Sequence, residues 1–188
     1  MKHKWVFKIK RSGVFRARLV ACGYSQVPGV DFNEIFSPVC NDITFRIVLI
    51  CMILWKMEGL IFDVITAFLT GDLEEEIYME CPQGMEHEDD EVLLLNKTIY
   101  GLVQASRQYN KKFSSILTKK MGFRQCRSDP CLFYQKNDKG IVIVLTYVDD
   151  NLCIGNKEAL EAVLQEIVTH GLQITVERNL TDSLSCEI

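Results

Sequence analysis

The 188-residue sequence has little of what several classes of protein require. Its three histidines lie far apart and its eight cysteines include no Cys-x-x-Cys pair, so a zinc site is not expected. The longest apolar run, 47–55, has nine residues. A membrane-spanning helix needs about 20. We therefore expect this run to be a buried core segment and expect no membrane partner. The N-terminus, MKHKWVFKIK, has no apolar region or cleavage site of a secretory signal, which predicts an intracellular protein.

Common catalytic signatures are also missing. The sequence has no Walker loop, no glycine-rich dinucleotide fingerprint, no calcium-binding loop and no serine in a nucleophile elbow. Most cysteines stand in apolar surroundings, where a free thiol behaves as a small core residue. With 48% hydrophobic and 24% charged residues, the composition is that of an ordinary globular protein.

Charge is segregated along the chain, although the net charge is only −4. Residues 1–30 hold seven basic residues and no acid, and residues 57–96 hold twelve acids and no basic residue. Residues 97–139 hold ten basic residues and two acids. Basic segments beside acidic ones suit a protein that binds phosphates and concentrates cations nearby. Solvated faces with local ion pairs explain the pattern equally well.

Hydrophobic periodicity predicts an α+β domain with a largely antiparallel sheet. Two β-hairpins are expected, over 5–20, with one apolar and one basic face, and over 131–147. Helices are expected over 43–56, 104–121 and 157–170, the first capped by Asn41 or Asp42 and the last by Asn156. Further short strands are expected at 60–65, 77–79, 92–95, 152–155, 172–177 and 183–188.

Three carboxylates fall where burial should disfavour them. Asp63 interrupts an apolar strand, and Asp149 and Asp150 end another. A buried carboxylate is normally paired or bound to a cation, and neither strand offers a basic neighbour. Oxygen ligands of this kind suit Mg²⁺ or Mn²⁺. Turn or capping roles for Asp149 and Asp150 remain an alternative. The acidic run 74–76 is expected to be a solvated face.

These residues belong to recognisable blocks. The segment Tyr147-Val-Asp-Asp150 resembles the catalytic hairpin of reverse transcriptases, and residues 62–79 resemble the first catalytic block of the copia-type (Pseudoviridae-like) retrotransposon enzymes. Further blocks follow the family's order along the chain, at 16–20, 36–39, 99–107, 129–130 and 184–188.

The resemblance implies a fold and a domain organisation. Residues 1–188 would form one reverse transcriptase domain with an antiparallel palm sheet backed by helices and the thumb largely absent. The fingers would be mainly 1–40 and 71–100, and the palm mainly 41–70 and 101–188. The chain would be a fragment of a Pol polyprotein, located in cytoplasmic virus-like particles or in the nucleus.

The resemblance also implies the chemistry. Asp63, Asp149 and Asp150 would be the catalytic residues and the ligands of two Mg²⁺ (or Mn²⁺) ions, with Asp149 ranked above Asp150. The reaction would be nucleotidyl transfer from a dNTP to a primer 3′-hydroxyl on an RNA or DNA template.

Four further residues match nucleotide-binding positions of the family. Arg16 and Arg18 would lie near the triphosphate, where guanidinium groups suit phosphate oxygens. Phe68 would close against the sugar and exclude a 2′-hydroxyl, unless its ring is ordinary core packing. Gln104 lies in the block that lines the nucleotide and template.

The sequence also departs from the family pattern. Val103 and Ser106 stand where Lys and Pro are common, and Cys22 stands where a basic residue is usual. A catalytically inactive remnant that at most binds nucleic acid is therefore the alternative, and an unrelated Mg²⁺-dependent phosphohydrolase is a third reading. Oligomeric state is left open.

Overall fold

The computed structural model describes residues 1–10, 13–178, 180, 182–183 and 186–187. The chain divides into two units. Unit 1 comprises Met1–Ser37 and Thr66–Lys112, and unit 2 comprises Pro38–Ile65 and Phe113–Ile188. The expected turn at residues 11–12, and residues 184, 185 and 188 of the last expected strand and family block, lie outside the described part of the chain.

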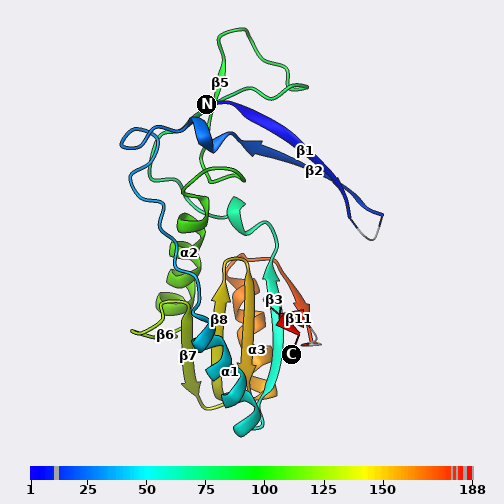
Figure 1. Ribbon diagram of the computed structural model, residues 1–188, viewed down its shortest axis with the longest axis vertical. Helices are drawn as coiled ribbons and strands as arrows, with labels where there is room; N and C mark the ends of the chain where they lie inside the picture. Colours follow the sequence, from blue (N-terminus) through cyan, green and yellow to red (C-terminus); the bar gives the residue numbers. More distant parts are fainter. Residues whose placement is uncertain (11–12, 179, 181, 184–185, 188) are drawn as a thin grey trace. The chain divides into compact units, whose positions relative to one another are not determined.

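Unit 2 is built on a six-stranded sheet in which every neighbouring pair is antiparallel (Figure 1). The strand order is β10-β3-β9-β8-β7-β6. The bounds are β3 (Glu58–Val64), β6 (Arg124–Gln125), β7 (Leu132–Asn137), β8 (Gly140–Tyr147), β9 (Asp150–Gly155) and β10 (Ile174–Glu177). Two short strands, β11 (Asp182–Ser183) and β12 (Cys186–Glu187), pair separately. The prediction of a mixed fold with a largely antiparallel sheet is confirmed.

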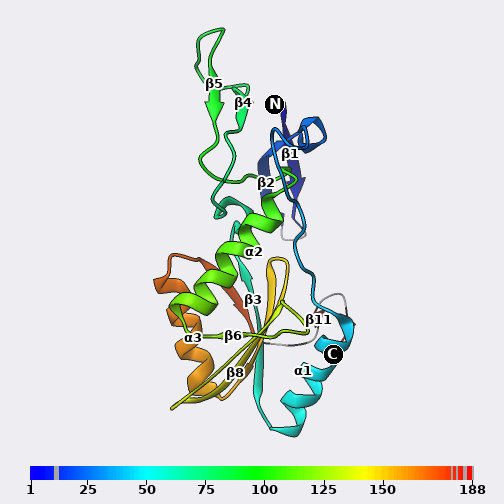
Figure 2. The same ribbon diagram turned by 90° about the vertical axis from the view of Figure 1, so that its left-hand side faces the viewer.

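Two helices cover opposite faces of this sheet (Figure 2). The first, α1 (Asp42–Leu54), begins after Asn41, whose side chain accepts a hydrogen bond from the Ile43 N–H at 2.9 Å. The second, α3 (Lys157–Thr169), follows Asn156 as predicted, but this side chain does not cap the helix. It instead accepts the Ile141 N–H across the sheet at 3.1 Å.

The expectation that 47–55 is a buried segment is wrong for most of its residues. Phe45 and Val48 are buried in α1 and belong to a core cluster with residues of the sheet such as Leu145. A helix presents only one face to a sheet, and no described segment covers the other face. The exposed apolar residues there are Ile43, Ile47, Ile50, Ile53, Leu54 and Trp55. Among the described residues, no helix is long and apolar enough to cross a membrane.

Unit 1 contains the N-terminal hairpin, formed by β1 (His3–Ile9) and β2 (Phe15–Ala21). A second strand pair joins β4 (Tyr78–Glu80) to β5 (Val92–Leu94). Two short 3-10 helices, η1 (Gly23–Ser25) and η2 (Ala67–Leu69), lie between these strands in the chain. A small core contains Ala21, Ile77, Leu102 and Ala105.

The helix expected over 104–121 is present, with one difference. An α-helix, α2 (Ala105–Ser115), continues as a π-helix, η3 (Ile116–Lys120), and the chain reverses at Gly122 with a φ of 74°. Residues of α2 up to Lys112 belong to unit 1, and the remainder belongs to unit 2. The boundary between the units therefore falls inside this helix.

The two faces of the β1–β2 hairpin separate by chemistry, as predicted. Lys8 lies opposite Arg16, and Arg18 lies two residues further along on the same face. Phe7 and Phe15, which belong to the other face, are 74% and 83% exposed. The apolar face is therefore not part of a core in the described structure.

The seven cysteines whose side chains are described are all free thiols. Cys22, Cys131 and Cys153 are buried. Burial raises the pKa of Cys40 to about 11 and that of Cys131 to about 12, so both stay protonated at neutral pH. The three buried cysteines are core residues, as predicted, and the other four described cysteines are partly buried.

Candidate active site

The β8–β9 hairpin reverses in a two-residue turn formed by Val148 and Asp149. Val148 has a φ of 60°. A β-branched residue rarely adopts this left-handed conformation, which costs about 1–3 kcal/mol and persists only where surrounding contacts hold it. The turn therefore stores strain at the position where the two adjacent carboxylates enter the sheet.

The three predicted carboxylates meet at this end of unit 2. Asp63, near the end of β3, is the direct cross-strand partner of Asp150, the first residue of β9, so both side chains leave the same face of the sheet. Asp149 stands next to them in the turn. Partial desolvation, then the negative charges of Asp149 and Asp63, raise the pKa of Asp150 above its usual range. The structure thus brings Asp63 to two adjacent residues that follow it by 86 and 87 positions in the sequence.

The arrangement does not by itself form a closed metal site. Within the described residues, no group of three or more His, Cys, Asp or Glu side chains has the geometry to hold a metal ion. What the structure shows is crowding of like charges at a solvent-accessible edge, with Asp150 exposed and Asp63 half-buried. Such crowding is unfavourable without a counter-charge, which is the condition that a divalent cation relieves.

A fully buried amide, which the sequence pattern did not single out, anchors the turn from the opposite face of the sheet. The side-chain nitrogen of Asn151 donates to the carbonyl oxygens of Asp149 at 2.9 Å and of Phe62 at 3.3 Å. The Val64 N–H also donates to the Asp149 carbonyl at 3.3 Å. Asn151 therefore ties the backbone of Asp149 to the strand that carries Asp63. Its own side-chain oxygen is buried without a hydrogen-bond partner among the described residues.

Asp129 organises the approach to the sheet from α1. It is 4% exposed and accepts the Asn41 N–H at 3.0 Å and the Cys131 N–H at 2.9 Å. Burial opposes its charge, but hydrogen bonds from the Thr44 side chain and from these two backbone groups outweigh burial and hold its pKa below the usual range. The Asp129-Pro130 block thus has a clear structural role.

Phe68 lies in η2 of unit 1 and is half-buried. Its ring makes edge-to-face contacts with Tyr100, at a centroid distance of 5.5 Å, and with Tyr109, at 6.3 Å. The Tyr100 carbonyl accepts the Ala21 N–H at 2.8 Å, and the next residue, Gly101, has a φ of 90° and leaves no room for a Cβ, which would lie 2.1 Å from the Ala21 carbonyl oxygen. An aromatic cluster of this kind fixes the orientation of the Phe68 ring.

Arg18 and Arg16 project from the basic face of β2. The Arg18 guanidinium lies over the Tyr100 ring, 4.9 Å from its centroid, in a cation–π contact. Its Nε is buried and has no hydrogen-bond partner in the described structure. Arg16 lies opposite Lys8 in the register, and neither side chain has an ion-pair partner among the described residues.

Gln104 is completely buried and engaged in unit 1. Its side-chain nitrogen donates to the Asp31 carbonyl at 2.9 Å and, at 3.5 Å, to Glu75. Its side-chain oxygen accepts from the Gln26 amide at 3.0 Å, and Gln26 also accepts the Val103 N–H. The observed contacts of Gln104 are therefore structural, and its predicted contact with a nucleotide would have to replace one of them.

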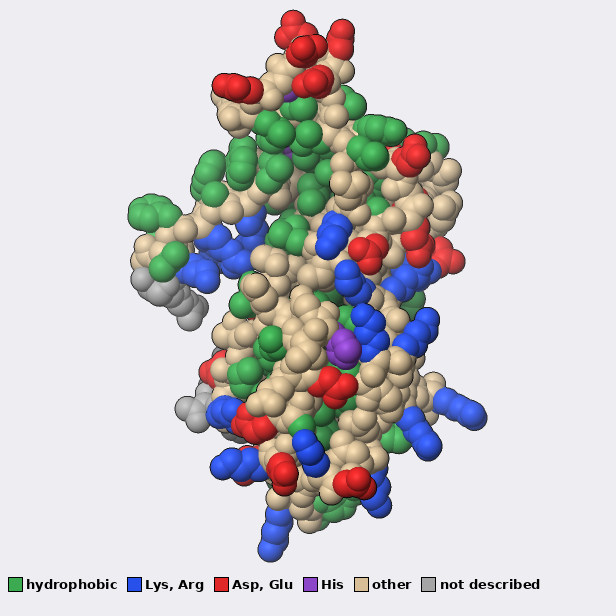
Figure 3. All heavy atoms as spheres, turned by 180° about the vertical axis from the view of Figure 1, so that it is seen from behind, with side chains coloured by type: hydrophobic (Ala, Val, Ile, Leu, Met, Phe, Trp, Pro, Cys, Tyr) green, Lys and Arg blue, Asp and Glu red, His purple; other side chains and the backbone are tan. Residues whose placement is uncertain are grey.

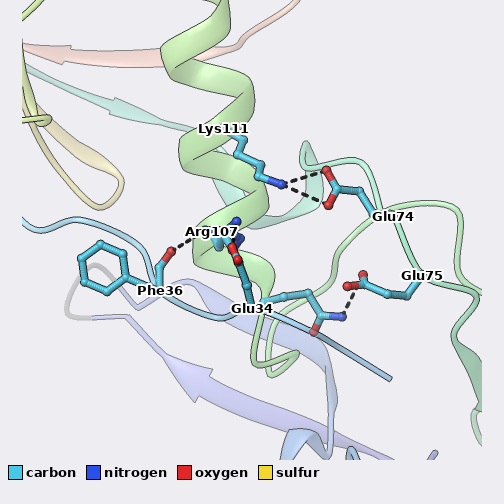
Figure 4. A network of polar contacts seen from close by, with 7 residues as sticks. Glu34, Phe36, Glu74, Glu75, Arg107 and Lys111 are labelled. Carbon is cyan, nitrogen blue, oxygen red and sulfur yellow. Dashed lines mark hydrogen bonds and ion pairs between the residues drawn. The ribbon is translucent and has the colours of Figure 1, made fainter. Parts of the chain in front are cut away.

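The cations of α2 are neutralised by ion pairs within unit 1 (Figure 4). Arg107 pairs with Glu34 and donates to the Phe36 carbonyl, while Lys111 binds both carboxylate oxygens of Glu74 at 2.9 and 3.0 Å. The hydrogen bond from Lys111 lowers the pKa of Glu74. A further cation of the helix, Lys112, pairs with Asp72 at 3.3 Å.

These ion pairs change the expected use of the basic segment 97–139. Its three α2 cations are engaged in surface ion pairs with carboxylates of unit 1 and would have to exchange these partners to contact phosphates. The acidic run 74–76, expected to be solvated, is in fact partly paired, through Glu74.

The predicted site residues fall into two groups. Asp63, Asp149 and Asp150 come together in unit 2, whereas Arg16, Arg18, Phe68 and Gln104 lie in unit 1. Within unit 1, the Tyr100 ring connects Arg18 to Phe68. Asn151 is the residue that sequence reasoning missed. Its only signal was a polar side chain directly after two acids at the start of an apolar strand.

Comparison with known proteins identifies relatives over most of the chain. Residues 1–175 match the family model described as "Reverse transcriptase (RNA-dependent DNA polymerase)". The chain is 43% identical over 173 residues to the retrovirus-related Pol polyprotein from transposon TNT 1-94 of Nicotiana tabacum, a match that covers 88% of this chain and 13% of the relative. It is 40% identical over 176 residues to the Pol polyprotein from transposon RE2 of Arabidopsis thaliana, with 86% and 12% covered.

A more distant relative is the transposon Ty1-BL Gag-Pol polyprotein of Saccharomyces cerevisiae, 28% identical over 146 residues. That match covers 78% of this chain and 8% of the relative. The chain thus spans about an eighth or less of the length of these relatives. The family match covers nearly the whole chain, and the plant relatives are of the copia type. The chain belongs to the reverse transcriptase (RNA-dependent DNA polymerase) family of copia-type retrotransposon Pol polyproteins.

Proposed function

We propose that this chain extends a primer on an RNA or DNA template by nucleotidyl transfer from dNTPs, as a reverse transcriptase domain of a copia-type Pol polyprotein. The observation that carries the proposal is the register of unit 2. It pairs Asp63 directly with Asp150 and puts Asp149 in the adjoining turn, so that three carboxylates share one end of the sheet.

The chemistry of this donor set fits divalent cations. All three groups are carboxylates, and after partial desolvation the charges of Asp149 and Asp63 also raise the pKa of Asp150, so a positive ion placed among them would relieve repulsion. Asp63, Asp149 and Asp150 would hold two Mg²⁺ or Mn²⁺ ions. When bound, such ions activate the primer hydroxyl and stabilise the charge on the triphosphate and the leaving pyrophosphate.

The protein's own contribution is to fix these carboxylates before substrate arrives. The β3–β9 ladder sets Asp63 against Asp150, and Asn151 together with the Val64 N–H holds the Asp149 backbone in a strained turn. Pre-organisation of this kind removes the cost of orienting the ligands during the reaction.

Unit 1 would supply the nucleotide contacts. Arg16 and Arg18 would bind the triphosphate, and the Tyr100 ring would keep the Arg18 guanidinium in place. Phe68, braced by two tyrosine rings, would stand against the sugar and disfavour a 2′-hydroxyl. Gln104 would line the nucleotide and template site. On this proposal, unit 1 corresponds to the fingers and unit 2 to the palm, and the protein works inside the cell, in cytoplasmic virus-like particles or in the nucleus.

Primer extension tests the proposal directly. The purified chain is incubated with an oligo(dT) primer on poly(rA), and in parallel on poly(dA), with dTTP and either Mg²⁺ or Mn²⁺. Extension by the wild type and its loss in Asp149→Asn would support the proposal. A folded wild type that extends no primer with either ion would instead support the inactive remnant.

A further inference from the structure

Seven basic residues of the segment 97–139 make no ion pair in the described structure, in contrast to the cations of α2. One of them, Lys97, is an exposed residue of unit 1, and the other six are exposed and belong to unit 2. They are Lys119, Lys120, Arg124, Arg127, Lys136 and Lys139. In Figure 3, Lys and Arg side chains (blue) stand out along the right-hand edge of the lower half, the side on which β6 and β7 lie in that view. Within the segment 97–139, most of the unpaired positive charge thus belongs to unit 2.

Two of these cations line a pocket at the β6 edge of the large sheet. The pocket has a volume of about 370 Å³ and is lined by Gly122, Arg124, Tyr134, Gln135 and Lys136. We call it the β6–β7 pocket. No acidic residue lines it. Gln135 is held by a hydrogen bond from its side chain to the Met121 carbonyl at 2.5 Å, so one wall is fixed.

Strand register sets the spacing of the groups in the pocket. Arg124 and Tyr134 are direct cross-strand partners, so their side chains leave the same face next to each other. Lys136 follows Tyr134 by two residues on that face, and its Cβ lies diagonally about 7–8 Å from that of Arg124. Tyr134 is 41% exposed. An accessible aromatic ring therefore stands beside two unpaired cations.

We propose that the β6–β7 pocket binds single-stranded nucleic acid, with a base stacked on Tyr134 and successive phosphates on Arg124 and Lys136. An aromatic surface flanked by cations is how proteins bind single strands without reading their sequence. The guanidinium and ammonium groups suit phosphate oxygens, and no lining carboxylate opposes them.

The pocket is separate from the carboxylates at the β8–β9 turn. Three strand spacings and four residues of β8 lie between the two positions, which corresponds to about 20 Å within unit 2. A strand bound at both places would cover several nucleotides. The newly made strand leaves paired with its template, so the single strand in the pocket would be template. This assignment rests on the proposed function, whereas binding of a single strand to the pocket does not.

The test is fluorescence anisotropy of the full chain with a short fluorescein-labelled oligothymidylate and, in parallel, oligouridylate, at several salt concentrations without divalent ions. The double variant Arg124→Gln/Lys136→Gln should bind several-fold more weakly. Its salt slope should fall by about 1.4, because each phosphate contact to a single strand contributes about 0.7. The control Lys56→Gln/Lys157→Gln removes the same charge from exposed positions of unit 2 and should bind like wild type.

A second variant separates stacking from charge. Tyr134→Leu should weaken binding about fivefold or more, because a stacked base is lost. Tyr24→Leu, at an 84% exposed tyrosine of unit 1, is the matched control and should not. Melting curves establish that each variant is folded.

Three outcomes would overturn the inference. The first is that Lys56→Gln/Lys157→Gln weakens oligonucleotide binding as much as Arg124→Gln/Lys136→Gln does. The second is that Tyr134→Leu leaves oligonucleotide binding unchanged. The third is that a polyglutamate of matched charge competes with the labelled oligonucleotide as well as an unlabelled oligonucleotide does. Asp149→Asn separates this inference from the proposed function, because it should abolish polymerisation and leave oligonucleotide binding unchanged. A wild type that binds through the pocket but never extends a primer would refute the proposed function alone.

Discussion

The contacts of Asn151 predict that Asn151→Leu disables the carboxylate site while leaving the fold in place. The substitution removes both hydrogen bonds that tie Asp149 and Phe62 together. Among the described residues, the Asp149 carbonyl then keeps the longer hydrogen bond from the Val64 N–H, at 3.3 Å. The left-handed conformation of Val148 loses part of what holds it, so the turn gains freedom to relax.

The effects on stability nearly cancel. Two neutral hydrogen bonds contribute about 0.5–1.5 kcal/mol each. Two gains oppose this loss. The buried, unpartnered oxygen of Asn151 destabilises the folded protein by about 1–3 kcal/mol, and Leu removes it. Leu also adds apolar surface at a fully buried position. The free energy of unfolding should change by no more than about 1–2 kcal/mol. Replacing a residue that supports a metal ligand lowers the metal affinity by about 10–100-fold. This corresponds to a loss of about 1.4–2.8 kcal/mol in the free energy of metal binding.

The assay is thermal unfolding at increasing Mg²⁺ or Mn²⁺, read as the rise in Tm, together with hydrogen exchange of the Val64 amide. Asn151→Leu should melt near wild type without metal, respond to about 10–100-fold higher metal concentrations and exchange the Val64 amide faster. The control Thr146→Val removes a neighbouring buried hydrogen bond, the one to the Cys131 carbonyl, and should keep the metal response. An unchanged metal response in Asn151→Leu would refute the reasoning.

Four more outcomes are expected. Asp149→Asn should abolish polymerisation and the rise in Tm with Mg²⁺. Without metal it should melt at or above the wild-type temperature, because repulsion among the carboxylates falls. Equal rises in Tm with metal in the two proteins would argue against a metal site. Phe68→Val should relax discrimination between dNTP and rNTP in primer extension, whereas a lower Tm with unchanged discrimination would mark the ring as core packing. Binding to template–primer should be weak and should fall steeply with salt in an anisotropy titration, and tight binding at high salt would contradict this. The pKa of Asp129 is lowered in the folded protein. Its ionised form therefore stabilises the fold at pH values above the usual carboxyl pKa of about 4, and this stabilisation is lost as pH falls through the pKa that Asp129 has in the folded state. Denaturant unfolding should accordingly show Asp129→Asn less stable than wild type near neutral pH, with the difference shrinking at acidic pH; a difference independent of pH would be inconsistent with this.

Local patterning in the sequence determined much of unit 2. Alternation of apolar residues, the turn residues and the cap at Asn41 follow from interactions between near neighbours in the chain, and the structure contains the corresponding hairpin, helices and strands. The carboxylates could be singled out for a similar reason. An acid at the end of an apolar strand is unusual wherever the strand lies, so Asp63 and Asp149 stood out without any knowledge of their neighbours.

Other features depended on contacts between distant residues and could not be predicted from patterns. The apolar run of α1 was expected to be buried, but a helix on a sheet buries one face, and composition does not reveal whether a second layer exists. The basic segment 97–139 was expected to contact phosphates. Only the tertiary structure pairs Lys111 with Glu74 and leaves Arg124 and Lys136 free of ion pairs among the described residues.

Asn151 shows the same limit at the candidate site. Its identity indicates only a polar residue at the start of an apolar strand, because an amide can donate to any nearby carbonyl. The register between β3 and β9 decides which carbonyls those are, and it selects Phe62 and Asp149. Sequence therefore determined which carboxylates are candidates for the chemistry, and tertiary structure decided how they are held, because support comes from strands that meet only after folding.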